Sequence, residues 1–212
     1  MAQMAVTGLR LFGVVPIPER GAIPPLTPDT TLIPVRELGA VVRAAPYARV
    51  EMSDAEVEDY SRTVGAIFER LTIVPAPFGA VFRSAAQVAR WLEIHYIALT
   101  EGVLFVDGRC EARVHITTDG EPPAQAEEAA KADGNALATD CFRTLRRQAA
   151  AAVPLRQPPP QTLLSGAFLV DRARWDEFAD LVGEEERRRA GLRFELTGPW
   201  PPYDFVRMDL GA

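Results

Sequence analysis

The side chains best suited to nucleophilic or metal chemistry are two histidines and two cysteines. They lie far apart, and no Cys-x-x-Cys pair, His-Glu-x-x-His pair, Gly-x-Ser-x-Gly elbow or glycine-rich phosphate loop accompanies them. His95 falls on the apolar side of a helix-like segment, and Cys110 alternates with polar residues like a strand residue facing a core. We therefore predict that the chain is not an enzyme and has no catalytic residue, bound metal or cofactor at His95, His115, Cys110 or Cys141.

Composition and charge exclude several kinds of partner. The 212 residues are 48% hydrophobic, enough for a sizeable core, and 23 basic against 29 acidic residues give a net charge of -6. This balance argues against binding to nucleic acid or to an acidic membrane surface. The longest uncharged run, Gln157 to Val170, is too short to span a membrane, and the N-terminus lacks the features of a secretory signal. With only two cysteines, we expect a cytoplasmic protein without a disulfide framework.

The first half of the chain alternates strand-like and helix-like segments. Leu9 to Val15 is an apolar, β-rich run, and two short β-branched runs flank Arg36-Glu37 as a hairpin would. Ser53 and Glu56 form a capping box, which predicts the start of a helix with an apolar stripe. Ser84 predicts a second helix that runs through His95 to Val103, with one apolar face made of Val88, Trp91, Leu92, His95, Ala98, Leu99 and Val103. The stripe of the first helix consists of Val57, Tyr60, Val64, Ile67, Phe68 and Leu71.

The second half predicts a compact βαββαβ unit. A strand over Cys110 to Ile116 precedes an alanine-rich helix over Ala124 to Val153, and a strand from Gln161 to Val170 follows a proline connector at Pro158-Pro159-Pro160. Asp171 is expected to cap the next helix, which leads to a last strand from Leu192. With a weak strand at Leu155, this is the order of a ferredoxin-like domain. We predict an α+β fold with two domains, residues 1–107 and 108–212.

Charged runs in the second half are expected to be solvated surface. Glu184 to Glu186 precede Arg187 to Arg189 at helical spacings of three and four, so we expect ion pairs within the run. Arg143, Arg146 and Arg147 form the one basic cluster and are also predicted to lie on a solvated face.

The closing segment, Thr197 to Val206, is held extended by three prolines. Trp200 and Tyr203 carry large apolar surfaces on this rigid backbone, so they could close the core or anchor a partner. Since Trp200 directly follows a strand and Gly198 permits close approach of the backbone, we expect Trp200 to belong to the core. Tyr203 is expected to combine both roles.

Two motifs in the chain resemble those of one known family. The closing Thr-Gly-Pro-Trp-Pro-Pro-Tyr run and the mid-chain block Val74 to Phe82 are similar in order and spacing to segments of the gas vesicle GvpF/GvpL family. Gly108 to Glu111 agrees with the strand that follows in that family, whereas Pro77 stands where many relatives have a basic residue. The resemblance covers nearly the whole chain and implies the same two-domain arrangement.

The resemblance also implies a function. It predicts an accessory or minor structural protein of gas vesicles that binds the hydrophobic shell protein GvpA, and other accessory proteins, during vesicle assembly. The alternative is a small-ligand-binding or regulatory protein built on the ferredoxin-like domain. Each candidate binding residue is an aromatic side chain of one of the two motifs and could instead belong to the core. The candidates are Trp200, Tyr203, Phe205, Phe78 and Phe82.

Overall fold

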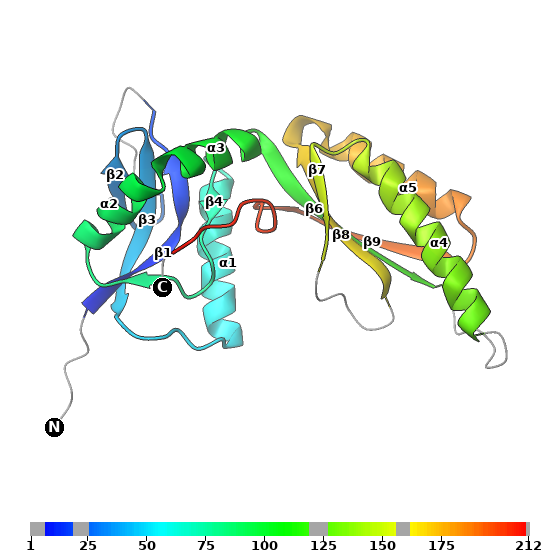
Figure 1. Ribbon diagram of the computed structural model, residues 1–212, viewed down its shortest axis with the longest axis horizontal. Coiled ribbons are helices and arrows are strands. Elements are labelled where there is room, and N and C mark those ends of the chain that lie inside the picture. The colour runs from blue at the N-terminus through cyan, green and yellow to red at the C-terminus, as the bar shows by residue number, and fades with distance from the viewer. Residues whose placement is uncertain (1–6, 19–25, 119–126, 156–161, 211–212) are drawn as a thin grey trace. The chain divides into compact units, whose positions relative to one another are not determined.

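The computed structural model describes residues 7–18, 26–118, 127–155 and 162–210 (Figure 1). The connector predicted at Pro158-Pro159-Pro160 and the helix start predicted at Ala124 lie outside these residues. The described chain forms two compact units: the first runs to Asp107 and takes in the closing residues from Pro201, and the second is Gly108–Trp200. Among the described residues, no helix has the length and apolar character needed to cross a bilayer.

The first unit is built on a sheet whose central strand is β1. β1 pairs antiparallel with β3 on one side and with the short strands β4 and β5 on the other, while β2 forms the outer edge next to β3. The chain is buried without interruption from Arg10 to Val15, as expected for an apolar run covered on both faces. The hairpin around Arg36 is confirmed. The strands are β1 (Thr7–Pro16), β2 (Thr31–Val35), β3 (Leu38–Pro46), β4 (Val74–Pro75) and β5 (Val81–Phe82).

Three helices complete this unit, α1 (Asp54–Phe68), α2 (Ala85–Ile94) and α3 (Tyr96–Val106). Ser53 and Ser84 cap α1 and α2 as predicted, each accepting a hydrogen bond from the backbone amide three residues later. The prediction of one continuous helix from Ser84 to Val103 is wrong. The chain breaks at His95, whose φ of -100° and ψ of 11° end α2 and begin α3.

The second unit has the predicted βαββαβ order. Neighbouring strands are antiparallel in the order β7-β8-β6-β9, which is the order expected of a ferredoxin-like sheet, and the predicted α+β class is confirmed. Phe168 of β8 packs between Phe142 of α4 and Phe178 of α5, with ring centroids 5.1 and 5.5 Å away. The elements are β6 (Arg109–Thr118), α4 (Glu127–Arg146), β7 (Ala151–Pro154), β8 (Thr162–Asp171), α5 (Trp175–Arg188) and β9 (Leu192–Trp200).

Two predicted boundaries in this unit are wrong. The alanine-rich helix ends at Arg146 instead of reaching Val153, because Ala151–Pro154 forms the edge strand β7 and Pro154 cannot continue a helix. Leu155, predicted to be the weak strand, adds one backbone hydrogen bond beyond β7. Asp171 caps no helix with its side chain: it ends β8, pairs with Arg109 at 3.3 Å, and a single 3-10 turn separates it from α5.

The charged run at the end of α5 is only partly a solvated face. Arg188 pairs with Glu184 and Glu185 at 3.2 Å, as the spacing predicted, but Glu185 is buried. Arg189 also reaches Asp140 of α4 at 2.9 Å. The run therefore helps to hold α5 against α4. The basic cluster Arg143, Arg146 and Arg147 is exposed, as predicted.

The closing segment is divided between the units, which corrects the prediction that it belongs to the second domain. Thr197 to Trp200 form the end of strand β9, whereas the residues from Pro201 onward pack with the first unit. Pro201 and Pro202 are buried. The second unit is therefore an insertion in the sequence of the first.

Candidate functional site

Three aromatic rings of the first unit lie around Tyr60 of α1, and we call the four rings together the Tyr60 cluster. The Tyr60 ring centroid lies 6.1 Å from that of Phe12, 5.7 Å from Phe78 and 6.3 Å from Tyr203. Phe78 belongs to the mid-chain motif and Tyr203 to the closing motif. The tertiary structure therefore brings the two family-like motifs to the same residue of α1, Tyr60.

The Tyr60 hydroxyl is fixed by a backbone contact. It donates a hydrogen bond to the carbonyl of Ala76, within the mid-chain motif. Burial, reinforced by Tyr203, raises the pKa of Tyr60 well above its usual value, so the hydroxyl keeps its proton as a hydrogen-bond donor. This contact joins α1 to the motif that follows it in the chain.

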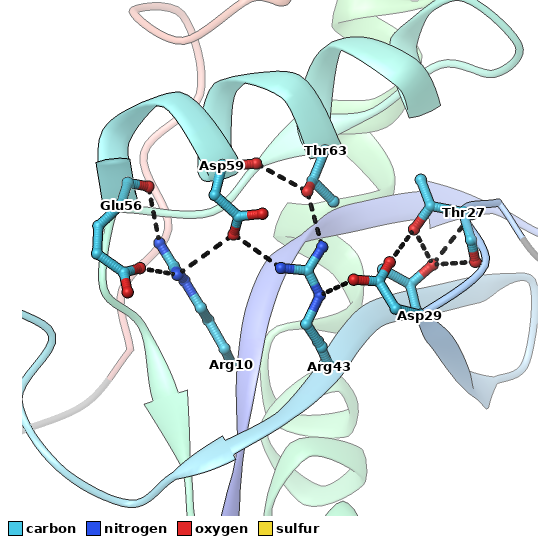
Figure 2. A network of polar contacts seen from close by, with 8 residues as sticks. Arg10, Thr27, Asp29, Arg43, Glu56, Asp59 and Thr63 are labelled. Carbon is cyan, nitrogen blue, oxygen red and sulfur yellow. Dashed lines mark hydrogen bonds and ion pairs between the residues drawn. The ribbon is translucent and has the colours of Figure 1, made fainter. Parts of the chain in front are cut away.

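A polar network lies beside this cluster, between α1 and strands β1 and β3 (Figure 2). Asp59 of α1 lies 3.7 Å from Arg10 and 2.7 Å from Arg43, so one carboxylate contacts both guanidinium groups. Arg10 also pairs with Glu56, and the Arg10 guanidinium lies over the Phe12 and Phe78 rings at 5.4 and 5.3 Å. Arg43 further contacts Asp29 and Thr63, at 2.7 and 2.9 Å.

This network corrects one detail of the sequence analysis. Glu56 was expected to complete the capping box by binding the Ser53 amide, but its carboxylate instead binds Arg10. A charged guanidinium is a stronger partner for a carboxylate than a backbone amide is. Both arginines of the network already contact carboxylates, so the arrangement fixes α1 on the sheet and offers no free cation to an anionic ligand.

The predicted binding aromatics have different environments. Phe82 is buried with its ring centroid 5.6 Å from that of Trp91, and Phe78 and Phe205 are partly buried. Trp200, predicted to belong to the core, is 44% exposed. It lies at the end of β9, the edge strand of the described sheet. Gly198 does permit a close approach of the backbone, because a Cβ placed on it would lie 2.8 Å from the Glu111 carbonyl oxygen and 2.8 Å from the Trp175 ring.

The end of the chain continues along the first unit beyond Tyr203. A Cβ built on Gly102 of α3 would lie 2.9 Å from a methyl group of Val206, so the two segments are in close contact. The Trp91 indole of α2 donates a hydrogen bond to the Asp209 carbonyl at 2.7 Å. The residues from Tyr203 to Asp209 thus contact α1, α2 and α3.

The histidines and cysteines do not form a reactive site. Cys110 is fully buried, and burial raises the pKa of its thiol to about 11, while burial also raises the pKa of Cys141. Burial lowers the pKa of His115, whose Nδ1 contacts the Ser165 hydroxyl. His95 lies at the helix break beside Trp91. Within the described ranges, no three His, Cys, Asp or Glu side chains are grouped as metal ligands.

Helices α2 and α3 carry an exposed apolar surface that the sequence pattern did not predict. Ile94, Ile97 and Leu104 are 68%, 73% and 69% exposed. The helical periodicity pointed to a single inward face and assigned Ala98 to it, but Ala98 is exposed. The sequence did contain a signal for this surface. Apolar residues occur on every side of a helix over Tyr96–Val106, which is more apolar surface than a single buried face requires.

An open cavity with a volume of about 280 Å³ lies in the second unit, between α5 and the end of β8. Half of its lining residues are charged, and several of the charges are already paired: Arg174 with Glu177, Asp171 with Arg109, and Glu184 with Arg188. Pockets for small molecules are usually larger and mainly apolar. This cavity does not provide the features of a ligand site.

Solved structures of two gas vesicle proteins share this fold. GvpF from Anabaena sp. PCC7120 superposes with a TM-score of 0.81 at 16% identity, covering 96% of this chain and 97% of that one. GvpF from Microcystis aeruginosa gives a TM-score of 0.75 at 17% identity, covering 95% and 99%. The fold is therefore one found in gas vesicle proteins.

Sequence comparison assigns the family. Gas vesicle protein F1 of Halobacterium salinarum is 26% identical over 84% of this chain and 81% of its own length. Gas vesicle protein L of Streptomyces sp. is 29% identical over 80% of each chain. The family model described as gas vesicle synthesis protein GvpL/GvpF matches residues 11–126 and 121–207. The chain belongs to the GvpL/GvpF family, as its two motifs indicated.

Proposed function

We propose that the protein is an accessory component of gas vesicles that binds the hydrophobic shell protein GvpA, together with other gas vesicle proteins, during assembly. We further propose that it acts in the cytoplasm at the growing vesicle and has no catalytic activity. Membership of the GvpL/GvpF family over nearly the whole chain is the observation that carries this proposal.

The exposed apolar surface of the first unit supports a binding role. A hydrophobic shell subunit exposes apolar area to water until it is incorporated in the wall, and a partner that covers this area limits aggregation. Ile94, Ile97 and Leu104 offer apolar side chains that the described chain leaves uncovered. The charged lining of the cavity in the second unit does not favour the alternative of a small-ligand sensor.

The proposal can be tested by co-expressing the tagged protein with the shell protein of the same host and purifying through the tag. We expect the shell protein to be retained, and a strain lacking the gene for this chain to form few or no gas vesicles. The tag alone serves as the control. Retention of no gas vesicle protein, together with normal vesicles in the deletion strain, would overturn the proposal.

A further inference from the structure

Helix α3 is apolar on two opposite sides. Its inner side packs on the sheet through four buried residues, at spacings of three, one and three, while the outer side carries exposed Ile97 and Leu104. A helix with apolar residues on all sides is normally buried on all sides. The outer side of α3 therefore has the composition of a covered surface. The buried residues are Leu99, Gly102, Val103 and Val106.

The exposed residues continue along one line across the break at His95. Ile94, Ile97, Glu101 and Leu104 follow one another at spacings of three, four and three, and all four are exposed. Backbone hydrogen bonds from His95 to Trp91 and from Leu99 to His95 keep helical spacing through the break. These four residues thus lie on one side, which we call the α2–α3 face.

Glu101 gives the α2–α3 face a single negative charge between its apolar residues. Among the described residues, no Lys, Arg or His forms an ion pair with Glu101. The charge is solvated in the isolated protein. An apolar partner covering Ile97 and Leu104 would remove part of that water, and a cation on the partner would offset the cost.

From the exposed apolar line and the carboxylate within it, we propose that the α2–α3 face docks an apolar helical segment carrying one lysine or arginine opposite Glu101. This inference rests on the proposed function, and the segment is taken to belong to the shell protein. Ile97 and Leu104 span about 10 Å along α3, which two turns of a partner helix would match. A second copy of this chain is a less suitable occupant, because each copy has a net charge of -6.

The test measures binding of the full-length protein to its host's shell protein GvpA, kept in solution as a fusion to a carrier protein. Ile97→Asp and Leu104→Asp place carboxylates on the α2–α3 face, and each is expected to weaken binding at least about tenfold, as loss of a central apolar contact does. Met52→Asp is the matched control, because Met52 is 80% exposed but lies outside this face. It should change binding less than about twofold.

Glu101 tests the charged part of the inference. Glu101→Lys should weaken binding more than Glu101→Gln does, because reversal adds repulsion whereas neutralisation only removes attraction. All five variants alter exposed side chains, so their melting temperatures should equal that of the wild type. A variant that does not fold is replaced by Ile97→Ser or Leu104→Ser.

The outcomes separate this inference from the proposed function. Wild-type binding that is unchanged by Ile97→Asp and Leu104→Asp would overturn the inference alone. So would a wild-type dimer that these substitutions convert to a monomer while shell-protein binding persists, since a second copy would then cover the face. Equal effects of Glu101→Lys and Glu101→Gln would overturn the charge pairing. A wild type that does not bind the shell protein would overturn both proposals.

Discussion

Tyr60 shows at the scale of one residue how the two family-like motifs are joined. Its ring contacts Phe78 and Tyr203, which come from the mid-chain and closing motifs, while its hydroxyl binds the Ala76 carbonyl. The ring supplies apolar area, and the hydroxyl satisfies a backbone acceptor at a buried position. A phenylalanine would keep the first contribution and lose the second.

We therefore expect Tyr60→Phe to destabilise the protein by about 1–3 kcal/mol, the cost of leaving a buried carbonyl without its donor. Urea denaturation followed by fluorescence measures this difference. Tyr96→Phe is the control, because the Tyr96 hydroxyl binds Glu37 at the surface and its loss should leave the midpoint unchanged. Equal midpoints for Tyr60→Phe and the wild type would show that the Ala76 contact adds no net stability.

At the scale of elements, the polar network decides how α1 lies on the sheet. Arg10 of β1 and Arg43 of β3 both contact Asp59, so one helical residue connects two neighbouring strands (Figure 2). The Asp59 side chain is 33% exposed and that of Arg10 only 7%. Water therefore screens part of the interaction, but loss of the carboxylate would leave a largely buried guanidinium with fewer partners.

Asp59→Ala should lower the free energy of unfolding by about 1–2 kcal/mol, less than for a fully buried pair because solvent screens the carboxylate. The neighbouring Glu58→Ala is the control: Glu58 and Arg62 form an exposed pair, with side chains 74% and 67% exposed, whose loss should cost at most about 0.5 kcal/mol. Calorimetry of both variants provides the comparison. A Glu58→Ala loss as large as that of Asp59→Ala would contradict the role of the network.

At the scale of the whole molecule, the chain leaves the first unit at Asp107 and returns to it at Pro201. The returning residues contact Tyr60 through Tyr203, Gly102 through Val206, and Trp91 through the Asp209 carbonyl. The first unit therefore depends on residues from both ends of the sequence. The sheet of the second unit is complete by Trp200.

Truncation after Trp200 should consequently affect the two units differently. We expect faster amide hydrogen exchange in peptides that contain Tyr60, Trp91 or Gly102, and unchanged exchange in the strands β6 and β8. Hydrogen exchange read by mass spectrometry reports both regions in the same sample, so the second unit is the internal control. Uniform protection across the truncated protein would contradict the assignment of the closing residues to the first unit.

Much of the secondary structure was determined by local sequence. The apolar run before Pro16, the hairpin at Arg36, the caps at Ser53 and Ser84, and the βαββαβ order follow from periodicity, turn residues and capping, which act over a few residues. The two motifs were also sufficient to indicate the GvpL/GvpF family. Helix ends were less predictable. Ala151–Pro154 becomes a strand by pairing with β8, and the break at His95 has no side-chain cap to mark it.

Contacts between distant segments were decided only by the tertiary structure. Sequence could identify Trp200 and Tyr203 as anchors but could not place one at an exposed sheet edge and the other against Tyr60. Nor could it show that Glu56 binds Arg10 instead of its own helix terminus, or that α3 has an apolar outer side. Periodicity gives the side of a helix that is apolar, whereas burial depends on what packs against it, and that is fixed only when the whole chain has folded.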